Sequence, residues 1–309
     1  MSHTNSFNTN SFNTNSYNTY NISDERSQIL AWLSPLEPRL RHQDIQDHRV
    51  EDVGEWLLKT EEFSSWYTGS GRRECGDAVM RCCFAMGIPG SARFILGNKA
   101  ELGGMERRGE VLTSCYFSSL VIDGLCDGVE EQDVAVACFY FDFAAKTEQL
   151  PKNMLGALLK QVVGGLRELP GEISKAYENQ KSVLGGRAPR LSDIVKMLQT
   201  TCSEKRTFIC IDALDECAAE YRVKILKSMN QILQKAPGTR IFATGRPHIQ
   251  DEVVRRLSGK VTAIRIALKR GDIIRYIRNR LDEDTTPDAM DSSLEAEILS
   301  KIPDDISEM

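Results

Sequence analysis

The sequence lacks any excess of basic charge. Its 309 residues include 39 Lys and Arg against 44 Asp and Glu, which gives a formal net charge of -5. Proteins that bind nucleic acid through their surface carry a basic patch that attracts the phosphates, and no such patch dominates here. The composition therefore argues against a nucleic-acid partner.

Segments that would place the chain in a membrane or a secretory pathway are also missing. The N-terminus shows no basic-plus-apolar signal segment, and no apolar run reaches membrane-spanning length. The nine cysteines are odd in number, form no CxxC pair and lie partly inside apolar runs, so they are typical of reduced core thiols, not of disulfides or a zinc site. We expect a cytoplasmic protein with no membrane partner.

Composition divides the chain into four parts. Residues 1–22 form an Asn/Ser/Thr-rich repeat with too little apolar surface to offset the entropy of ordering, which predicts a disordered tail; self-association of this tract is the alternative. Residues 23–71 show helical spacing and are predicted to be a helical linker segment. Residues 72–284 alternate strand and helix patterns, and residues 285–309 form a C-terminal helical segment.

Two further groups of residues are assigned to packing and to the surface. Trp56, Phe63 and Trp66 are spaced as a helical aromatic set, and we expect them to dock residues 23–71 onto the domain that follows. His42 and His248 have no acid or cysteine at a diagnostic spacing. We therefore expect both histidines on the surface.

The stretch from Thr207 to Glu216 joins an apolar run to three acids. A short β-favouring segment stops at Asp212, and Asp215 and Glu216 follow. Ligands of open parallel α/β sheets bind where strands end, so a carboxylate there is well placed to hold a metal beside a phosphate. The alternative is a core strand followed by an acidic turn whose charges complement the dipole of the next helix.

A second apolar segment, Val79 to Met86, leads into the glycine-rich turn GIPGS. Glycines let successive backbone N–H groups face an anion, and the N-terminus of the next helix completes a phosphate cradle. The full pattern is GxxxxGK[ST], but Ala92, Arg93 and Phe94 stand where Gly, Lys and Ser/Thr are needed. The alternative is an ordinary Gly/Pro turn.

The segment after this turn departs from a compact strand-to-helix connection. Arg93 to Glu110 is charged and rich in glycine without a sustained period, which indicates a loop. Helical spacing resumes near Thr113 or Ser114. The sequence therefore predicts an insert over about residues 93–114 that separates the glycine-rich turn from its helix.

Beyond the insert, strands and helices alternate. The predicted strands cover residues 134–141, 207–212, 240–244 and 261–268, and the predicted helices cover residues 154–166, 191–198, 221–233, 273–281 and 294–302. Helices of this length between strands indicate a mostly parallel sheet with right-handed connections, hence an α/β fold.

The ordered set GIPGS, FICIDALDEC and RIFATGRP resembles the NACHT family of STAND-type P-loop NTPases. The likeness is to the version common in filamentous fungi, close to the nephrocystin-like N-terminal module, and VAVACFYFDFAAK adds to it. It covers roughly residues 28–309 apart from the insert. The resemblance implies a P-loop NTPase three-layer sandwich that acts as a nucleotide-driven signalling switch and self-associates. Relatives commonly continue into repeat domains, which are absent here, so the chain looks truncated relative to the family.

The resemblance also assigns the glycine-rich turn to the first part of a Walker A loop. The matching residues are Gly87, Ile88, Pro89, Gly90 and Ser91. The GKT or GKS that should complete the loop is missing. The expected ligands are Mg²⁺ with ATP or GTP, and the missing lysine and hydroxyl imply that their binding is impaired.

Four residues further along match the acidic half and the sensor of such a site. Asp212 matches the Walker B acid that holds Mg²⁺, usually through water. Asp215 and Glu216 match the acids that orient or deprotonate the attacking water. Arg246 matches a sensor arginine that reads the outer phosphate, with a solvated surface arginine as the alternative.

Three functional hypotheses follow. The chain is a NACHT-type nucleotide-dependent switch with impaired binding and hydrolysis, or a pseudo-NTPase scaffold that keeps the fold without nucleotide chemistry. In the third hypothesis the insert is intron sequence read as protein, and the active product carries an intact GKT or GKS. Sequencing the transcript across residues 92–116 tests the third hypothesis, because a message that retains every codon rejects it.

Overall fold

The computed structural model describes residues 25–69, 81–87, 109–127, 134–182, 188–257, 261–266, 269–282 and 292–307. Three sequence predictions fall outside these residues: the disordered tail over residues 1–22, the greater part of the insert, and the loop residues Ile88, Pro89, Gly90 and Ser91.

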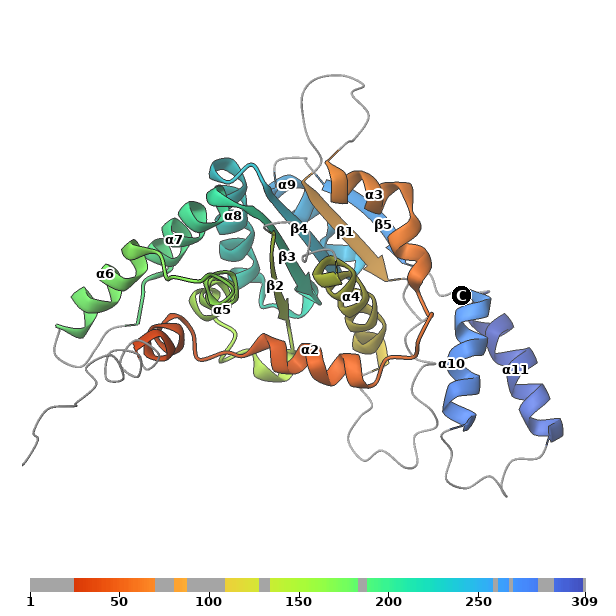
Figure 1. Ribbon diagram of the computed structural model, residues 1–309. Helices are drawn as coiled ribbons and strands as arrows, with labels where there is room; N and C mark the ends of the chain where they lie inside the picture. The colour runs from red at the N-terminus through yellow and green to blue at the C-terminus, as the bar shows by residue number, and fades with distance from the viewer. Residues whose placement is uncertain are drawn as a thin grey trace, which may run out of the picture.

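Five parallel strands form one sheet in the order β2-β3-β4-β1-β5 (Figure 1). The strands are β1 (Cys82–Gly87), β2 (Val134–Tyr140), β3 (Arg206–Asp212), β4 (Thr239–Gly245) and β5 (Val261–Ile266). All five lie within or beside the predicted strand segments, and β5 is an edge strand as expected. The predicted α/β fold class is confirmed, and β4 lies between β1 and β3.

The helices lie before, between and after the strands. They are a helix over residues 25–33, α2 (Pro38–Asp47), η1 (Glu55–Lys59), α3 (Glu61–Thr68), α4 (Gly109–Asp127), η3 (Phe143–Ala145), α5 (Pro151–Gly164), α6 (Gly171–Lys181), α7 (Leu191–Glu204), η4 (Leu214–Glu216), α8 (Ala219–Lys235), η5 (Pro247–Ile249), α9 (Gln250–Arg256), α10 (Arg270–Asp282) and α11 (Ser292–Ser307). Within the parts of the chain described above, none of these helices is long and apolar enough to cross a membrane.

Two helices differ from the sequence prediction. Helix α4 begins at Gly109, four residues before Thr113. Adding a residue to an existing helix is far easier than starting one, so the unfavourable helix propensity of a single glycine, about 1 kcal/mol, can be offset. Helix α6 was not predicted. Ile173 is its one buried residue, so its sequence carries almost no apolar period.

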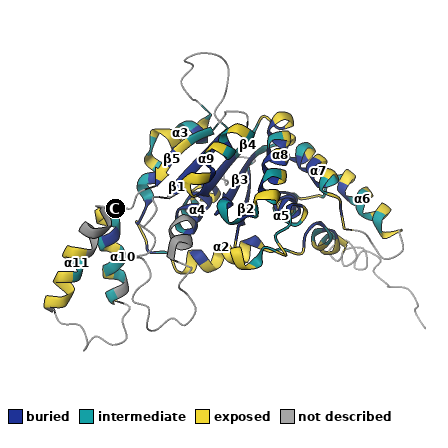
Figure 2. Ribbon diagram, turned by 180° about the vertical axis from the view of Figure 1, so that it is seen from behind, coloured by how far each residue is buried: buried dark blue, intermediate teal, exposed yellow. Residues whose placement is uncertain are grey.

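Alternate side chains of β1, β2, β3 and β4 enter two separate cores. In β1, Cys82, Phe84 and Met86 face one side of the sheet, and Cys83 and Ala85 face the other. Helices α5, α7, α8 and α9 cover the first side, whereas α2, η1, α3 and α4 cover the second. The result is a three-layer sandwich with buried strands at its centre (Figure 2).

The aromatic set of the N-terminal segment packs against the sheet, as predicted. Trp66 is fully buried, and its Nε1 donates a hydrogen bond to the carbonyl oxygen of Ile241 in β4 at 3.0 Å. Its ring lies 5.5 Å from that of Phe208 and 5.8 Å from that of Phe242. Residues 38–69 therefore supply part of the layer that covers the second face of the sheet, whereas Ile29 and Leu33 pack into the core on the first face.

Side chains cover the outer edge of β2. Gln161 of α5 accepts a hydrogen bond from the Cys138 backbone N–H at 3.1 Å and donates one to the Cys138 carbonyl at 2.8 Å. Arg39 of α2 donates to the carbonyl of Val136 at 3.3 Å. These contacts replace a sixth strand, because an uncovered edge would leave backbone groups unpaired and open to another chain.

Replacing Gln161 should show how much its contacts with the edge of β2 stabilise the protein. Gln161→Leu leaves a backbone donor and acceptor of Cys138 without a partner, so the free energy of unfolding should fall by about 1–3 kcal/mol in urea titrations. The control is Gln199→Leu, because Gln199 makes one exposed bond to the carbonyl of Gln231, and its change should stay within about 0.5 kcal/mol. Equal losses in the two variants would refute the edge role.

Candidate functional site

The carboxyl ends of β1, β3 and β4 meet at one edge of the sheet. The register pairs Met86 with Gly245 and Ile211 with Ala243, so Gly87 and Asp212 leave the sheet on either side of the last residues of β4. Gly87 is thereby placed at this edge, as predicted. Parallel α/β sheets bind their ligands at such an edge.

Asp212 is buried at the end of β3, with only 1% of its surface exposed. Its Oδ1 accepts hydrogen bonds from Ser118 Oγ of α4 and Thr244 Oγ1 of β4, both at 2.6 Å. Its Oδ2 accepts from Cys115 Sγ of α4 at 2.8 Å. A buried carboxylate is tolerated when several donors compensate its lost hydration, and these three side chains do so.

The chain turns sharply immediately after Asp212. Ala213 has a φ of 51°, in the left-handed region that residues with a Cβ rarely adopt. Its backbone N–H donates to Thr244 Oγ1 at 3.0 Å, so Thr244 links the turn to the Asp212 carboxylate. This turn starts η4, which carries Asp215 and Glu216 away from the strand.

Asp215 and Arg246 face each other across the ends of β3 and β4. Asp215 Oδ1 accepts a hydrogen bond from the backbone N–H of Arg246 at 3.2 Å, and Oδ2 lies 3.4 Å from Arg246 Nε. The Asp215 side chain is 9% exposed, and that of Arg246 is 55% exposed. The predicted sensor arginine is therefore at the expected edge, in an ion pair with one of the predicted acids.

Glu216 lies at the same edge in a different electrostatic setting. Burial raises its pKa to about 7, helped by the charges of Asp215, Asp212 and Asp142, while a hydrogen bond from the Phe143 N–H at 2.9 Å opposes the shift. A carboxyl group that titrates near neutral pH is suited to accept a proton from a reacting water. Glu216 is thus the candidate general base of this edge.

Sequence reasoning missed the partners of Asp212. Cys115 and Ser118 are three residues apart, so they lie on one face of α4 and reach the same carboxylate. Thr244 ends the apolar part of β4, next to the residue that pairs with Ile211. The one available signal was this i, i+3 polar pair on an otherwise apolar helix face.

The prediction that His42 lies on the surface is wrong. Its ring nitrogens contact Tyr140 Oη at 2.8 Å and Asp123 Oδ1 at 3.0 Å, and its side chain is 13% exposed. The acid partner comes from α4, 81 residues further along the chain, so spacing in the sequence could not reveal it. His248 is exposed, as predicted.

The surroundings of Asp212 fit Mg²⁺ poorly. Mg²⁺ binds hard oxygen ligands, and a thiol is a soft ligand that it does not favour. At Asp212, two hydroxyl donors occupy Oδ1 and the Cys115 sulfur faces Oδ2. Among the residues whose positions are described, no group of three or more His, Cys, Asp or Glu side chains is arranged to hold a metal ion.

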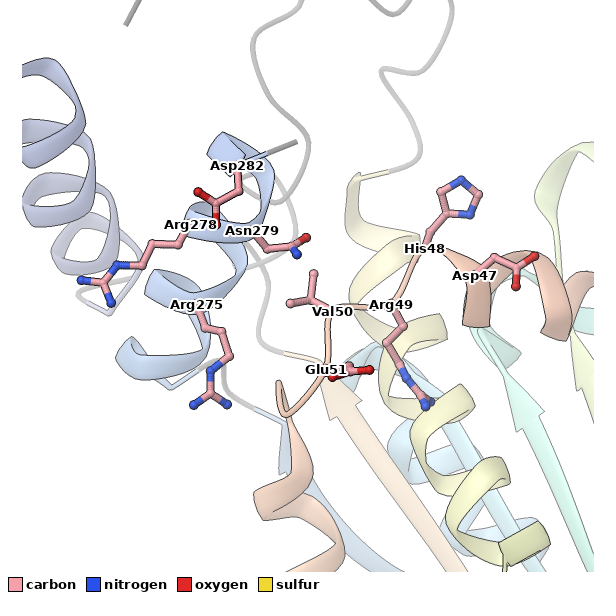
Figure 3. Close-up of a pocket in the computed structure, with 9 residues that line it drawn as sticks. All are labelled: Asp47, His48, Arg49, Val50, Glu51, Arg275, Arg278, Asn279 and Asp282. Atoms are coloured by element: carbon pink, nitrogen blue, oxygen red, sulfur yellow. The ribbon is translucent and has the colours of Figure 1, made fainter. Parts of the chain in front are cut away.

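A cavity of about 540 Å³ lies elsewhere, between the end of α2 and α10 (Figure 3). It is lined by Asp47, His48, Arg49, Val50, Glu51, Arg275, Arg278, Asn279 and Asp282. In Figure 3, Arg278 points away from the loop that carries Val50. Arg275 Nη1 donates a hydrogen bond to the carbonyl oxygen of Asp52 in that loop at 3.0 Å, whereas Arg49 pairs with Asp123 of α4 at 2.6 Å. The arginines do not converge, so this cavity forms no anion site and is separate from the acidic edge.

The central part of the chain matches a known protein family. Residues 114–246 match the family model described as Nephrocystin 3, N-terminal. The resemblance to the nephrocystin-like module is therefore confirmed over this segment, which begins within α4 and ends at Arg246. No curated protein matches the chain.

Comparison with solved structures gives distant neighbours. The ORC1 protein of Aeropyrum pernix, solved in complex with DNA, has a TM-score of 0.41 at 11% identity and covers 75% of this chain and 50% of its own. The Walker-type ATPase PABY2304 of Pyrococcus abyssi has a TM-score of 0.41 at 11% identity, with 82% and 66% covered. Drosophila ORC bound to AT-rich DNA and Cdc6 has a TM-score of 0.32 at 11% identity, with 80% and 59% covered. The chain spans half to two thirds of the length of these structures.

The left-handed turn at Ala213 should be strained. Ala213→Gly removes the Cβ that disfavours this conformation, so the free energy of unfolding should rise by about 0.5–1 kcal/mol in urea titrations, after the entropy of the added glycine is subtracted. The control is Ala176→Gly, because Ala176 lies inside helix α6, where glycine costs about 0.5–1 kcal/mol relative to alanine. The control should lose stability, and a loss of the same size in Ala213→Gly would exclude strain at this turn.

Glu216 should make the stability of the protein fall as the pH rises. Its ordinary pKa is 4.5 and its folded pKa is about 7, so the folded state holds a proton that the unfolded chain releases between these values. Stability should therefore fall as the pH rises from about 4.5 to 7. Glu216→Gln keeps an acceptor for the Phe143 N–H and should flatten this slope in thermal melts taken from pH 5 to 8. Parallel curves for the two proteins would show that Glu216 titrates outside this window.

Proposed function

We propose that this chain, whose residues 114–246 match the nephrocystin 3 N-terminal family, is a NACHT-type nucleotide-dependent signalling switch with weakened nucleotide binding and hydrolysis. The observation that carries the proposal is the gathering of Asp212, Asp215, Glu216 and Arg246 at the carboxyl edge of a parallel sheet, beside the end of β1. The three acids lie at or just after the end of β3, and the arginine follows β4. Asp215 and Arg246 are 31 residues apart in the sequence, and the sheet brings them to one edge because the carboxyl ends of parallel strands meet there.

The residues of this edge have separate roles in the proposal. Glu216, with a pKa of about 7, accepts the proton of the attacking water. Arg246 is the group that reads the outer phosphate, and its ion pair with Asp215 holds it at the edge until a more highly charged phosphate competes for the guanidinium. Gly87 begins the backbone turn that approaches the phosphates.

Weak binding follows from the sequence between β1 and α4. The lysine and hydroxyl of a complete phosphate loop are missing at Arg93 and Phe94, and their loss removes two charge-directed contacts. The family match begins only at residue 114, downstream of GIPGS, which is what an insertion between the loop and its helix would produce. ATP and GTP are both candidate ligands.

A pseudo-NTPase scaffold is the second candidate, because the contacts of Asp212 favour it. A carboxylate that is bound by two hydroxyls and a thiol stabilises the fold without any ligand. Under both hypotheses we propose a cytoplasmic module that self-associates through the NTPase domain. Nucleotide changes the degree of self-association only if the chain is a switch.

Nucleotide titration separates the two candidates. Fluorescent ATP and GTP analogues are titrated into the purified chain, and into a variant in which residues 92–115 are replaced by Gly-Lys-Thr, with Gly-Ala-Ala as the matched control. The Gly-Lys-Thr variant should bind about 10- to 100-fold more tightly than the other two, because a charge-assisted phosphate contact contributes about 1.5–3 kcal/mol. Sedimentation with and without nucleotide then reports self-association.

Two results would contradict the proposal. If neither the native chain nor the Gly-Lys-Thr variant binds nucleotide, the switch is excluded and the scaffold is favoured. If the native chain binds as tightly as the Gly-Lys-Thr variant, the interruption of the phosphate loop does not weaken nucleotide binding. The proposal that binding is impaired is then wrong.

A further inference from the structure

Cys115 lies on α4 beside the carboxylate of Asp212. This helix is the one that follows the glycine-rich segment, and Cys115 is the seventh of its 19 residues. It contacts the acid at the end of β3. In a complete phosphate loop, the residue at the start of this helix carries the Ser/Thr hydroxyl that binds Mg²⁺. Here the side chain of α4 that reaches the Oδ2 atom of that acid carries a thiol.

The Cys115 thiol acts as a hydrogen-bond donor to Asp212. Cys115 is 1% exposed, and its sulfur lies 2.8 Å from Asp212 Oδ2. A neutral thiol at this position satisfies the carboxylate and offers no hard oxygen to a cation.

Ser118 and Thr244 complete the arrangement at the other oxygen. Both are 1% exposed, and both hydroxyls lie 2.6 Å from Asp212 Oδ1. They come from α4 and β4, so a single carboxylate joins α4, β3 and β4. The backbone adds β2, because the Phe141 N–H donates to the Asp212 carbonyl at 3.1 Å.

We propose that Asp212 is a structural carboxylate in this chain, held by Cys115, Ser118 and Thr244, and that Cys115 takes the place of a divalent cation at its second oxygen. The inference rests on the proposed function only in treating Asp212 as the counterpart of a metal-holding acid. It makes Cys115 a positioning residue that keeps the α4–β3–β4 junction closed without Mg²⁺.

The experiment compares thermal midpoints of the full chain without nucleotide, in EDTA and in millimolar Mg²⁺. The variants are Cys115→Ala, which removes the donor, and Cys115→Ser, which restores one. The matched control is Cys210→Ala, because Cys210 is equally buried and pairs in register with Cys138 of β2. In EDTA, Cys115→Ala should melt roughly 3–10 °C below Cys210→Ala, since it leaves a buried carboxylate oxygen short of a donor.

Three results support the proposal together. Cys115→Ala melts below Cys210→Ala, Cys115→Ser recovers at least half of the difference, and Mg²⁺ leaves the native midpoint unchanged. The proposal is overturned if Cys115→Ala and Cys210→Ala melt alike, if Cys115→Ser gives no recovery, or if Mg²⁺ raises the native midpoint.

This test is independent of nucleotide binding, so the two proposals can fail separately. A chain that binds no nucleotide but shows the expected midpoints loses the switch and keeps the structural carboxylate. A chain that binds nucleotide and gains stability from Mg²⁺ keeps the switch and loses the structural carboxylate.

Discussion

The buried carboxylate of Asp212 is the constraint on which the candidate site depends. One side chain with 1% of its surface exposed accepts hydrogen bonds from α4 and β4 while it terminates β3. Burying a charge is costly unless several donors compensate it, so each partner must stay in place for the junction to be stable. The positions of Glu216, Asp215 and Arg246 follow, because the turn at Ala213 that carries the two acids is bonded to Thr244, a partner of that carboxylate.

The acids of the edge differ by burial and by partner. Asp212 is enclosed and held by neutral donors, whereas Asp215 is paired with Arg246, whose side chain is 55% exposed. Burial raises the pKa of Glu216 to about 7, and its hydrogen bond from the Phe143 backbone N–H only partly opposes this shift. One sequence motif of five residues therefore supplies a structural anchor, an ion-pair partner and a proton acceptor, because the strand end and the left-handed turn place the three carboxyl groups in three environments.

The sequence predicted the sheet well because parallel strands buried on both faces are nearly continuous apolar runs. The segments that became β2, β3 and β4 carry that signal, and the acids were placed at the correct edge because a strand end fixes their position. Contacts between distant segments carried no such signal. Asp123 reaches His42 from 81 residues away, and Gln161 covers β2 from the following helix.

The role of the Cys115 thiol could not be predicted from the sequence for a different reason. A small buried residue inside an apolar helix is usually a packing residue, and only the fold shows that its sulfur faces a carboxylate. Ser118 was missed for the same reason, because its hydroxyl donates to Asp212, which lies 94 residues further along the chain. The fold determines which polar groups reach a buried charge, so an alternating pattern of strands and helices in the sequence does not identify them.

The most direct test of the structural role of Asp212 is a crystal structure of the chain grown with Mg²⁺ and a slowly hydrolysed ATP analogue. The account predicts that both Asp212 oxygens keep their bonds to Cys115, Ser118 and Thr244, with no cation bound to the carboxylate directly or through water. A Mg²⁺ ion that reaches Asp212, with the Cys115 sulfur displaced from Oδ2, would contradict it.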